Sequence, residues 1–509
     1  MKKQFCLITT LLICLLALGT SSSLAAGPKT GGTLIYATGT DAHTLDPQFV
    51  TDVPTSRMVM HIHQTLVYPD LEGNIQPVLA ESWSVSDDKL TWTFKLRKGV
   101  TFHDGTPFNA ESVKYTFDRI NDPDIGSPRK SAAKAIKEVK VIDELTVSFV
   151  TGKPFAPFLA QLSAYNLSII SPTAAKKWGK KYSEHPSGTG PFKLESWSPG
   201  EKMLMARNEN FWGQKTYVDK LEIRIVPEDS SRVMMLLSGD VDVIASVPPI
   251  MLKRLDKSKD VKIIKKTGFR TIYIGMNNKM KPFDNPAVRK AVAHAINAKA
   301  IVDGILGGVG TLGGGFESPV IPGAHKNLPP REYNSEKAKK MLADAGYPNG
   351  FETTFYTSTG RYLMDRQVAE AVQAQLKEVG INAKLQTPDW GAYRALLDKQ
   401  TEVPIFLLGK GSPTGDLDLT ATLTAACNAK MNHFNYCSPK ADELINKQRG
   451  IVDVKERHAV LAEFQELFYE DSPAVVLFYE DQIFGTRANV NGVWVNPNEF
   501  IGFFNAWKE

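Results

Sequence analysis

The sequence predicts an α/β protein of two or three lobes. Strand-like and helix-like segments alternate along the chain, with no internal repeat and no low-complexity linker between them, which is the pattern of α/β folds. At 509 residues the chain is too long for one simple hydrophobic core. Its composition, 42% hydrophobic and 23% charged, is typical of a globular protein rather than a disordered one.

The N-terminus has the organisation of a secretory signal peptide. Lys2 and Lys3 precede an apolar stretch of about 14 residues, shorter than the roughly 20 that span a bilayer. Small residues around Ala25 then suit signal peptidase. An uncleaved anchor helix is the alternative, but the short apolar core favours removal of residues 1–26 and a soluble mature protein in the periplasm.

Local patterns predict the first elements. Residues 34–37 form a short strand that ends in a polar loop, where Thr40 is a candidate ligand contact. Residues 90–96 alternate polar and apolar side chains, as a half-buried strand does. Helices are expected after Asn109, a favourable N-cap residue, and after Asn285, where proline takes the first helical position.

The later half contains clearer α/β units. Strands are expected at residues 353–356 and 381–385, with an amphipathic helix at residues 365–379 between them. Residues 404–408 are nearly all apolar, as in a strand buried on both faces. The polar loop of residues 409–418 follows directly. Because open α/β sheets bind ligands beyond the carboxyl ends of their strands, this loop is the best site candidate.

Charge and cysteine content exclude several classes of protein. The net charge of +5 falls to +3 without the two lysines of the leader, and no segment concentrates basic residues, which argues against a nucleic-acid binder. Cys427 and Cys437 are the two cysteines outside the leader, and in an oxidising compartment we predict that they form a disulfide. A metal pair is the alternative, but His433 is the one further good ligand between them, and zinc prefers four.

Characteristic motifs recur from about residue 31 to the C-terminus. They include Leu79-Ala80-Glu81-Ser82-Trp83, the run from Phe94 to Phe108, Gly188-Thr189-Gly190-Pro191-Phe192, Asn208-Glu209-Asn210-Phe211-Trp212, the run from Lys281 to Arg289, and the run from Ala345 to Phe351. Together they resemble the signature of family 5 extracellular solute-binding proteins of ABC importers. That family includes dipeptide-, oligopeptide-, nickel- and glutathione-binding proteins, and the resemblance covers essentially the whole mature chain.

The resemblance implies two α/β lobes that close on a ligand, with an extra α/β domain inserted in lobe one. On this chain the expected parts are lobe one (residues 27–53, 186–268 and 480–509), the inserted domain (54–185) and lobe two (269–479). Crossovers near Gly268 and Tyr479 would form the hinge. Closure couples ligand binding to shape, since contacts from both lobes exist together only in the closed state.

The resemblance also implies roles for the loop of residues 409–418. In peptide-binding relatives this loop lends backbone groups to the peptide, here those of Gly411 and Ser412, and carries an Asp that pairs with the free N-terminus. In this chain Lys410 stands where many relatives have Trp, and Pro413 stands where that Asp would be. Asp416 matches a later acidic position, although it could instead cap the following helix. The loop looks closest to that of the glutathione-binding branch.

Four further residues are candidate ligand contacts. Arg361 follows a strand and could hold a ligand carboxylate through its two-pronged guanidinium, or pair with Asp416 instead. Trp390 and Tyr393 follow the next strand and could line a pocket or pack in the core, with core packing the stronger expectation for Tyr393. Asn277, beside the hinge, could contact the ligand or cap a turn.

These features predict the periplasmic substrate-binding component of an ABC importer. It would capture a short peptide or peptide-like solute, with a glutathione-like solute as one candidate, and deliver it to permease subunits served by separate ATPase subunits. We expect a monomer with no cofactor, no metal, no nucleic-acid partner and no enzymatic activity, since no nucleophile or metalloprotease motif occurs. The alternatives are a ligand sensor for a chemoreceptor or histidine kinase, a binder of an opine, metal chelate or haem, and a secreted hydrolase.

Overall fold

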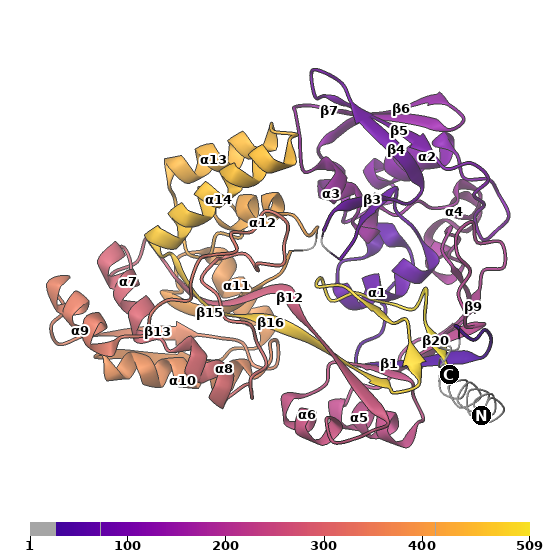
Figure 1. Cartoon of the computed structure of the whole chain (residues 1–509). Helices are drawn as coiled ribbons and strands as arrows, with labels where there is room; N and C mark the ends of the chain where they lie inside the picture. The colour runs from indigo at the N-terminus through magenta and orange to yellow at the C-terminus, as the bar shows by residue number, and fades with distance from the viewer. Residues whose placement is uncertain (1–26, 72, 413) are drawn as a thin grey trace, which may run out of the picture.

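The computed structural model describes residues 27–71, 73–412 and 414–509, which fold into two lobes that lie side by side (Figure 1). The expected signal peptide, residues 1–26, lies outside the described residues, as does Pro413. Within the described ranges, no helix combines the length and the apolarity that crossing a membrane requires.

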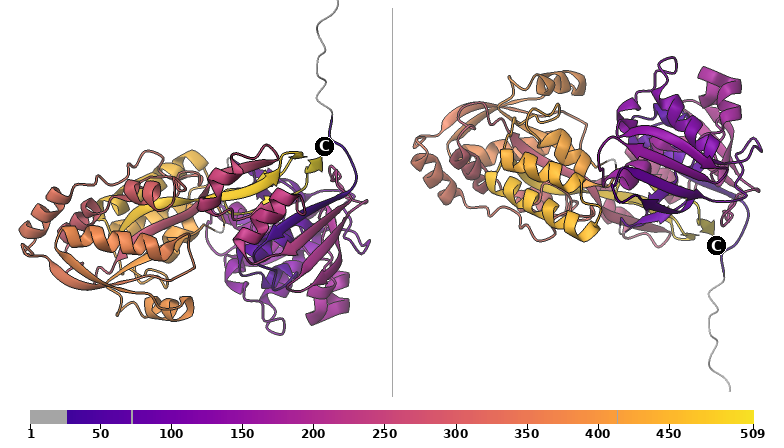
Figure 2. Two further views of the ribbon diagram at one scale, coloured as in Figure 1. Left: turned by 90° about the horizontal axis from the view of Figure 1, so that it is seen from below. Right: turned by 90° about the horizontal axis from the view of Figure 1, so that it is seen from above.

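Both lobes share two long strands, β12 (Val261–Met276) and β16 (Ala474–Arg487), which pair antiparallel. Figure 2 shows them passing through the narrow waist between the lobes. Their register shifts between Thr267 and Thr271, where the chain passes from one lobe to the other. We call this stretch, together with Glu480 opposite it, the hinge.

Lobe one extends the sheet from β16 through five further strands. In order they are β11 (Val243–Ala245), β1 (Thr33–Thr38), β10 (Lys220–Ile225), β9 (Lys202–Arg207) and β8 (Phe192–Ser198). Helices α5 (Asp229–Ser238) and α6 (Pro249–Leu255) lie beside β11 and β12, respectively. Helix α1 (Val53–Ile62) buries Met58, Val59 and Ile62 in the lobe-one core, although the predicted inserted domain begins at residue 54.

The segment between α1 and β8, which we call the intervening unit, forms a separate unit around its own core. Its sheet has the order β4 (Ala80–Val85), β5 (Thr91–Leu96), β7 (Thr146–Thr151) and β6 (Ile136–Asp143). Helix α2 (Ala110–Asn121) begins at a capping box between Asn109 and Ser112, and α3 (Phe158–Leu162) and α4 (Pro172–Trp178) follow. Phe94, Phe117 and Phe149 are buried at its centre.

Lobe two extends the sheet from β12 in the opposite direction, through β15 (Ile405–Lys410), β13 (Phe351–Tyr356) and β14 (Ile381–Gln386). These strands lie within two residues of their predicted bounds. The helices are α7 (Pro286–Ala295), α8 (Ala298–Gly304), α9 (Ser335–Asp344), α10 (Asp365–Glu378), α11 (Trp390–Lys399), α12 (Leu417–Thr424), α13 (Pro439–Arg449) and α14 (Val454–Asp471). The mixed α/β fold with two lobes is therefore confirmed.

A disulfide joins Cys427 to Cys437 in the segment between α12 and α13, as predicted. The two residues are separated by 10 positions, so the bridge closes a small loop. This loop lies directly after α12, the helix that begins at the end of the candidate ligand loop.

Replacing both cysteines by serine should lower the free energy of unfolding by about 2–3 kcal/mol, because the unfolded chain regains the entropy of an open loop. Urea unfolding of the wild-type chain and of the double variant, both without residues 1–26, measures this difference. Thiol labelling of the unfolded, unreduced wild-type chain should find no free thiol, and two labelled thiols would contradict the pairing.

Candidate functional site

The candidate residues of lobe two lie where its parallel strands end. β13 runs parallel to both β14 and β15. The loops that carry Arg361 and Gly411, and the loop that leads to Trp390 at the start of α11, therefore leave the sheet on the same side. In β12, Thr271 is paired with Lys410, which places this side of the sheet beside the hinge. We call it the hinge edge of lobe two.

Lobe one presents a similar edge to the hinge. β1 and β11 are parallel, and Ala245 at the end of β11 lies opposite Phe484 of β16. Thr40 follows β1 and is exposed, and Ser246 follows β11 with a φ of 59°. Beneath them the buried Arg232 donates to the carbonyl of Ala245 at 3.2 Å. Neither Ser246 nor Arg232 occurs in a motif that is recognisable in the sequence.

Arg361 is exposed on the hinge edge of lobe two and lies over two aromatic rings. Its guanidinium carbon is 5.2 Å from the ring centroid of Trp390 and 5.3 Å from that of Tyr362. Asp365, the first residue of α10, accepts a hydrogen bond from the backbone N–H of Arg361 at 2.9 Å and so fixes the loop. Within the described part of the chain, the Arg361 guanidinium makes no ion pair, which leaves it available to an anion.

Two other candidates are structural in this conformation. Tyr393 is fully buried, and its hydroxyl donates to the carbonyl of Leu407 at 2.6 Å. Asn277 is also fully buried; its amide donates to the carbonyl of Gln400 at 3.1 Å and accepts from the N–H of Lys279 at 3.1 Å. These contacts match core packing for Tyr393 and turn capping for Asn277, the alternatives to ligand contact.

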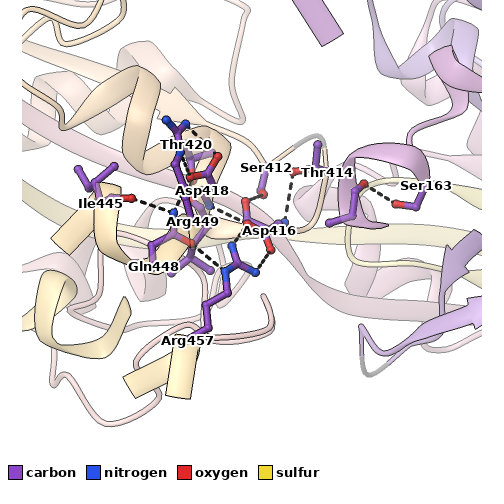
Figure 3. Close-up of polar contacts among 12 residues, drawn as sticks. Ser163, Ser412, Thr414, Asp416, Asp418, Thr420, Ile445, Gln448, Arg449 and Arg457 are labelled. Atoms are coloured by element: carbon purple, nitrogen blue, oxygen red, sulfur yellow. Dashed lines mark hydrogen bonds and ion pairs between the residues drawn. The ribbon is translucent and has the colours of Figure 1, made fainter. Parts of the chain in front are cut away.

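Asp416 caps α12 and forms a buried ion pair (Figure 3). Its carboxylate accepts from the N–H of Asp418 at 2.8 Å and from both terminal nitrogens of Arg457, at 2.6 and 2.7 Å. The suggested pairing of Asp416 with Arg361 is therefore wrong, since Arg457 takes that place. The hydroxyl of Ser412 donates to the Asp416 carbonyl at 3.2 Å and braces the loop from the other side.

A second acid of this segment is also engaged. Asp418 accepts from Arg449 at 2.6 and 3.1 Å and from Gln448, which ties the start of α12 to α13 (Figure 3). The carbonyl of Arg449 in turn accepts from the N–H of Ala156 at 2.7 Å. The candidate ligand loop of lobe two is thereby linked through α13 to the intervening unit.

Lys410, the last residue of β15, is buried. Its ammonium group pairs with Glu317, whose side chain is 1% exposed, and lies 4.5 Å from the ring centroid of Phe316. Glu317 also accepts from the hydroxyl of Thr420 in α12 at 2.8 Å. Burial outweighs the attraction of Glu317 and lowers the pKa of Lys410. This pair holds β15 against α12 rather than facing solvent.

Four charged side chains meet at the hinge, and no sequence motif marks them as a group. Arg270 lies 2.8 Å from Glu480 and 2.7 Å from Glu499, and Arg57 lies 3.8 Å from Glu499. We call these four residues the hinge charge cluster. Burial disfavours the charge of Arg270, but the two carboxylates outweigh burial and raise its pKa.

Two buried histidines lie at the end of α1, His61 within the helix and His63 as its C-cap residue. Burial lowers the pKa of His61 to about 4 and that of His63 to about 3, so both rings are neutral at physiological pH. Outside the undescribed residues, no group of three or more His, Cys, Asp and Glu side chains is placed to hold a metal ion.

Replacing Asp416 by asparagine should lower the free energy of unfolding by about 3 kcal/mol, because Arg457 then stays buried without its counter-ion. Asparagine retains the helix cap, so the change isolates the ion pair. Urea unfolding measures the effect. The control is Asp398→Asn. The side chain of Asp398 pairs with Arg394 but is 41% exposed, so losing this pair should cost less than about 1 kcal/mol. An Asp416→Asn variant that is as stable as the wild type but no longer binds ligand would contradict the structural role of Asp416.

Known proteins resemble the chain over nearly its full length. The family model "Bacterial extracellular solute-binding proteins, family 5 Middle" matches residues 74–432. The glutathione-binding protein GsiB of Salmonella typhimurium is 32% identical over 97% of this chain and 98% of its own. Among solved structures, Helicobacter pylori DppA in complex with the peptide STSA matches with a TM-score of 0.78 at 32% identity, over 94% of this chain and 99% of its own. HbpA2 from Haemophilus parasuis matches with a TM-score of 0.86 at 27% identity, over 94% of this chain and 100% of its own. The chain therefore belongs to family 5 of the bacterial extracellular solute-binding proteins.

Proposed function

We propose that this chain is the periplasmic substrate-binding component of an ABC importer and that its solute is a short, acidic, glutathione-like peptide. The observation that carries the proposal is the guanidinium of Arg361 on the hinge edge of lobe two, which forms no ion pair with any other described residue. The acids of the nearby loop, Asp416 and Asp418, are both taken by arginines of the protein. This chemistry favours a ligand that presents a carboxylate.

The mechanism requires binding and closure rather than catalysis. Arg361, Trp390 and the backbone of Gly411 and Ser412 would bind the solute from lobe two, and Thr40 would bind it from lobe one. Because these groups flank the hinge from opposite lobes, a solute that touches both stabilises the closed arrangement. The closed, monomeric protein would then deliver the solute to the permease subunits, and separate ATPase subunits would drive transport.

The ligand's amine is expected to matter less than its carboxylate. Relatives that anchor a free amine place an Asp where this chain has Pro413, and Asp416 does not compensate, because Arg457 binds both of its oxygens. The similarity to glutathione-binding proteins fits this chemistry, since glutathione carries two carboxylates. Arg361 can bind one of them through two parallel hydrogen bonds.

Calorimetry with reduced glutathione tests the proposal. Amidating the carboxylate that Arg361 binds should weaken binding roughly tenfold to a hundredfold, because a hydrogen bond to a charged group is lost. Acetylating the amine should weaken it much less. Arg361→Ala should erase the difference, whereas the control Arg366→Ala, which removes an exposed pair with Glu370 on the same helix, should not.

Two results would count against the proposal. If amine acetylation were the more damaging change, the carboxylate anchor would be wrong. If the purified mature chain bound no glutathione at all, the glutathione-like ligand would be wrong, and mass spectrometry of a solute retained through purification would identify the true one.

A further inference from the structure

The hinge contains a bulge that redirects Arg270. Thr267 is paired with Asp481 and Thr271 with Tyr479, so residues 268–270 of β12 lie opposite Glu480 alone. Phe269 consequently donates its backbone N–H to the carbonyl of Pro497 at 2.9 Å. A bulge of this kind re-aims a side chain out of the regular alternation of a strand, and it brings the Arg270 guanidinium between two carboxylates.

One of these carboxylates comes from a hairpin of the C-terminal segment. Strands β18 (Trp494–Val495) and β19 (Ile501–Gly502) form this hairpin, and Glu499 lies at its tip. Glu499 has a φ of 73°, a left-handed conformation that is unfavourable for residues with a Cβ. Its carbonyl accepts from Arg57 Nε of α1 at 2.6 Å. The tip of this hairpin thus places the Glu499 carboxylate beside Arg270 of the hinge.

Arg270 is a close neighbour of the proposed ligand anchor. Its guanidinium carbon is 6.0 Å from the ring centroid of Tyr362, the same ring that lies 5.3 Å from the guanidinium carbon of Arg361. The side chain of Arg270 is 16% exposed and that of Glu499 is 18% exposed, so neither is sealed from solvent. Arg270 and Arg361 therefore flank the same aromatic ring.

We propose that Arg270 is a second carboxylate-binding residue of the ligand site and that Glu499 occupies it until the ligand arrives. This inference rests on the proposed function and specifies its ligand as a peptide-like molecule with two carboxylates. Arg361 binds one of them and Arg270 binds the other, in place of Glu499. Specificity for a second acidic group then resides in the hinge itself.

The exchange leaves no charge without a partner. Glu499 keeps its contacts with Arg57 after it leaves Arg270, and Arg270 keeps Glu480. Replacing one carboxylate by another avoids the large cost of a buried, unpaired charge. The planar guanidinium of Arg270 can bind the incoming carboxylate with the same geometry that it uses for Glu499.

Calorimetry on the mature chain tests this assignment with three probes: reduced glutathione and its two monoamides, each with one carboxylate blocked. Glu499→Gln should bind glutathione about tenfold more tightly, because the competing carboxylate is gone. Arg270→Gln should bind glutathione about tenfold to a hundredfold more weakly. One of the two monoamides lacks the carboxylate that Arg270 would bind. Its affinity should be unchanged by Glu499→Gln and by Arg270→Gln but should still fall with Arg361→Ala.

The matched control is Glu209→Gln, which removes an exposed pair with Arg207 on lobe one and should change no affinity. Equal effects of Arg270→Gln and Glu499→Gln on glutathione and on both monoamides would overturn the inference alone, because a purely structural cluster does not distinguish the ligand's carboxylates. Should Arg270→Gln fail to fold, an unchanged or lower glutathione affinity of Glu499→Gln would overturn it. A wild-type chain that binds no glutathione would overturn the proposed function and this inference together.

Discussion

The antiparallel pairing of β12 with β16 positions every residue that we place at the ligand site. It makes one continuous ten-stranded sheet of both lobes. Because β15 pairs with β12 and β11 pairs with β16, the carboxyl ends of the parallel strands in both lobes lie beside the hinge. Loops that follow such ends bind ligands in open α/β sheets, so one pair of strands brings the two candidate edges together and connects them through the register shift at the hinge.

Several charged side chains beside the edge of lobe two form ion pairs with other residues of the protein. Asp416 and Asp418 pair with Arg457 and Arg449 to fix the start of α12, and Lys410 pairs with Glu317 to hold β15 against it. Pairs of this kind are strongly destabilising when one partner is lost, so they constrain the loop rather than serve the solute. The guanidinium of Arg361 forms no ion pair with any residue that the structure describes, and on this we base the proposed preference for an acidic ligand.

Local patterns predicted the elements well and the charge pairs poorly. The strand at Ile405–Lys410 and the helix at Asp365–Glu378 follow from hydrophobic periodicity within a few residues. The position of Arg361 at the hinge edge followed from its place after a strand. Partners distant in the sequence could not be found this way: Asp416 and Arg457 are 41 positions apart, and Arg270 and Glu480 are 210 apart. Only the three-dimensional arrangement decides which acid reaches which cation.

Small-angle X-ray scattering of the mature chain tests the central claim that a solute binds by bringing the two lobes together. With saturating glutathione, the account predicts a smaller radius of gyration than in the ligand-free protein, because contacts from both lobes form together only on closure. An unchanged radius of gyration, in a sample for which calorimetry has established binding, would contradict capture by lobe closure about β12 and β16.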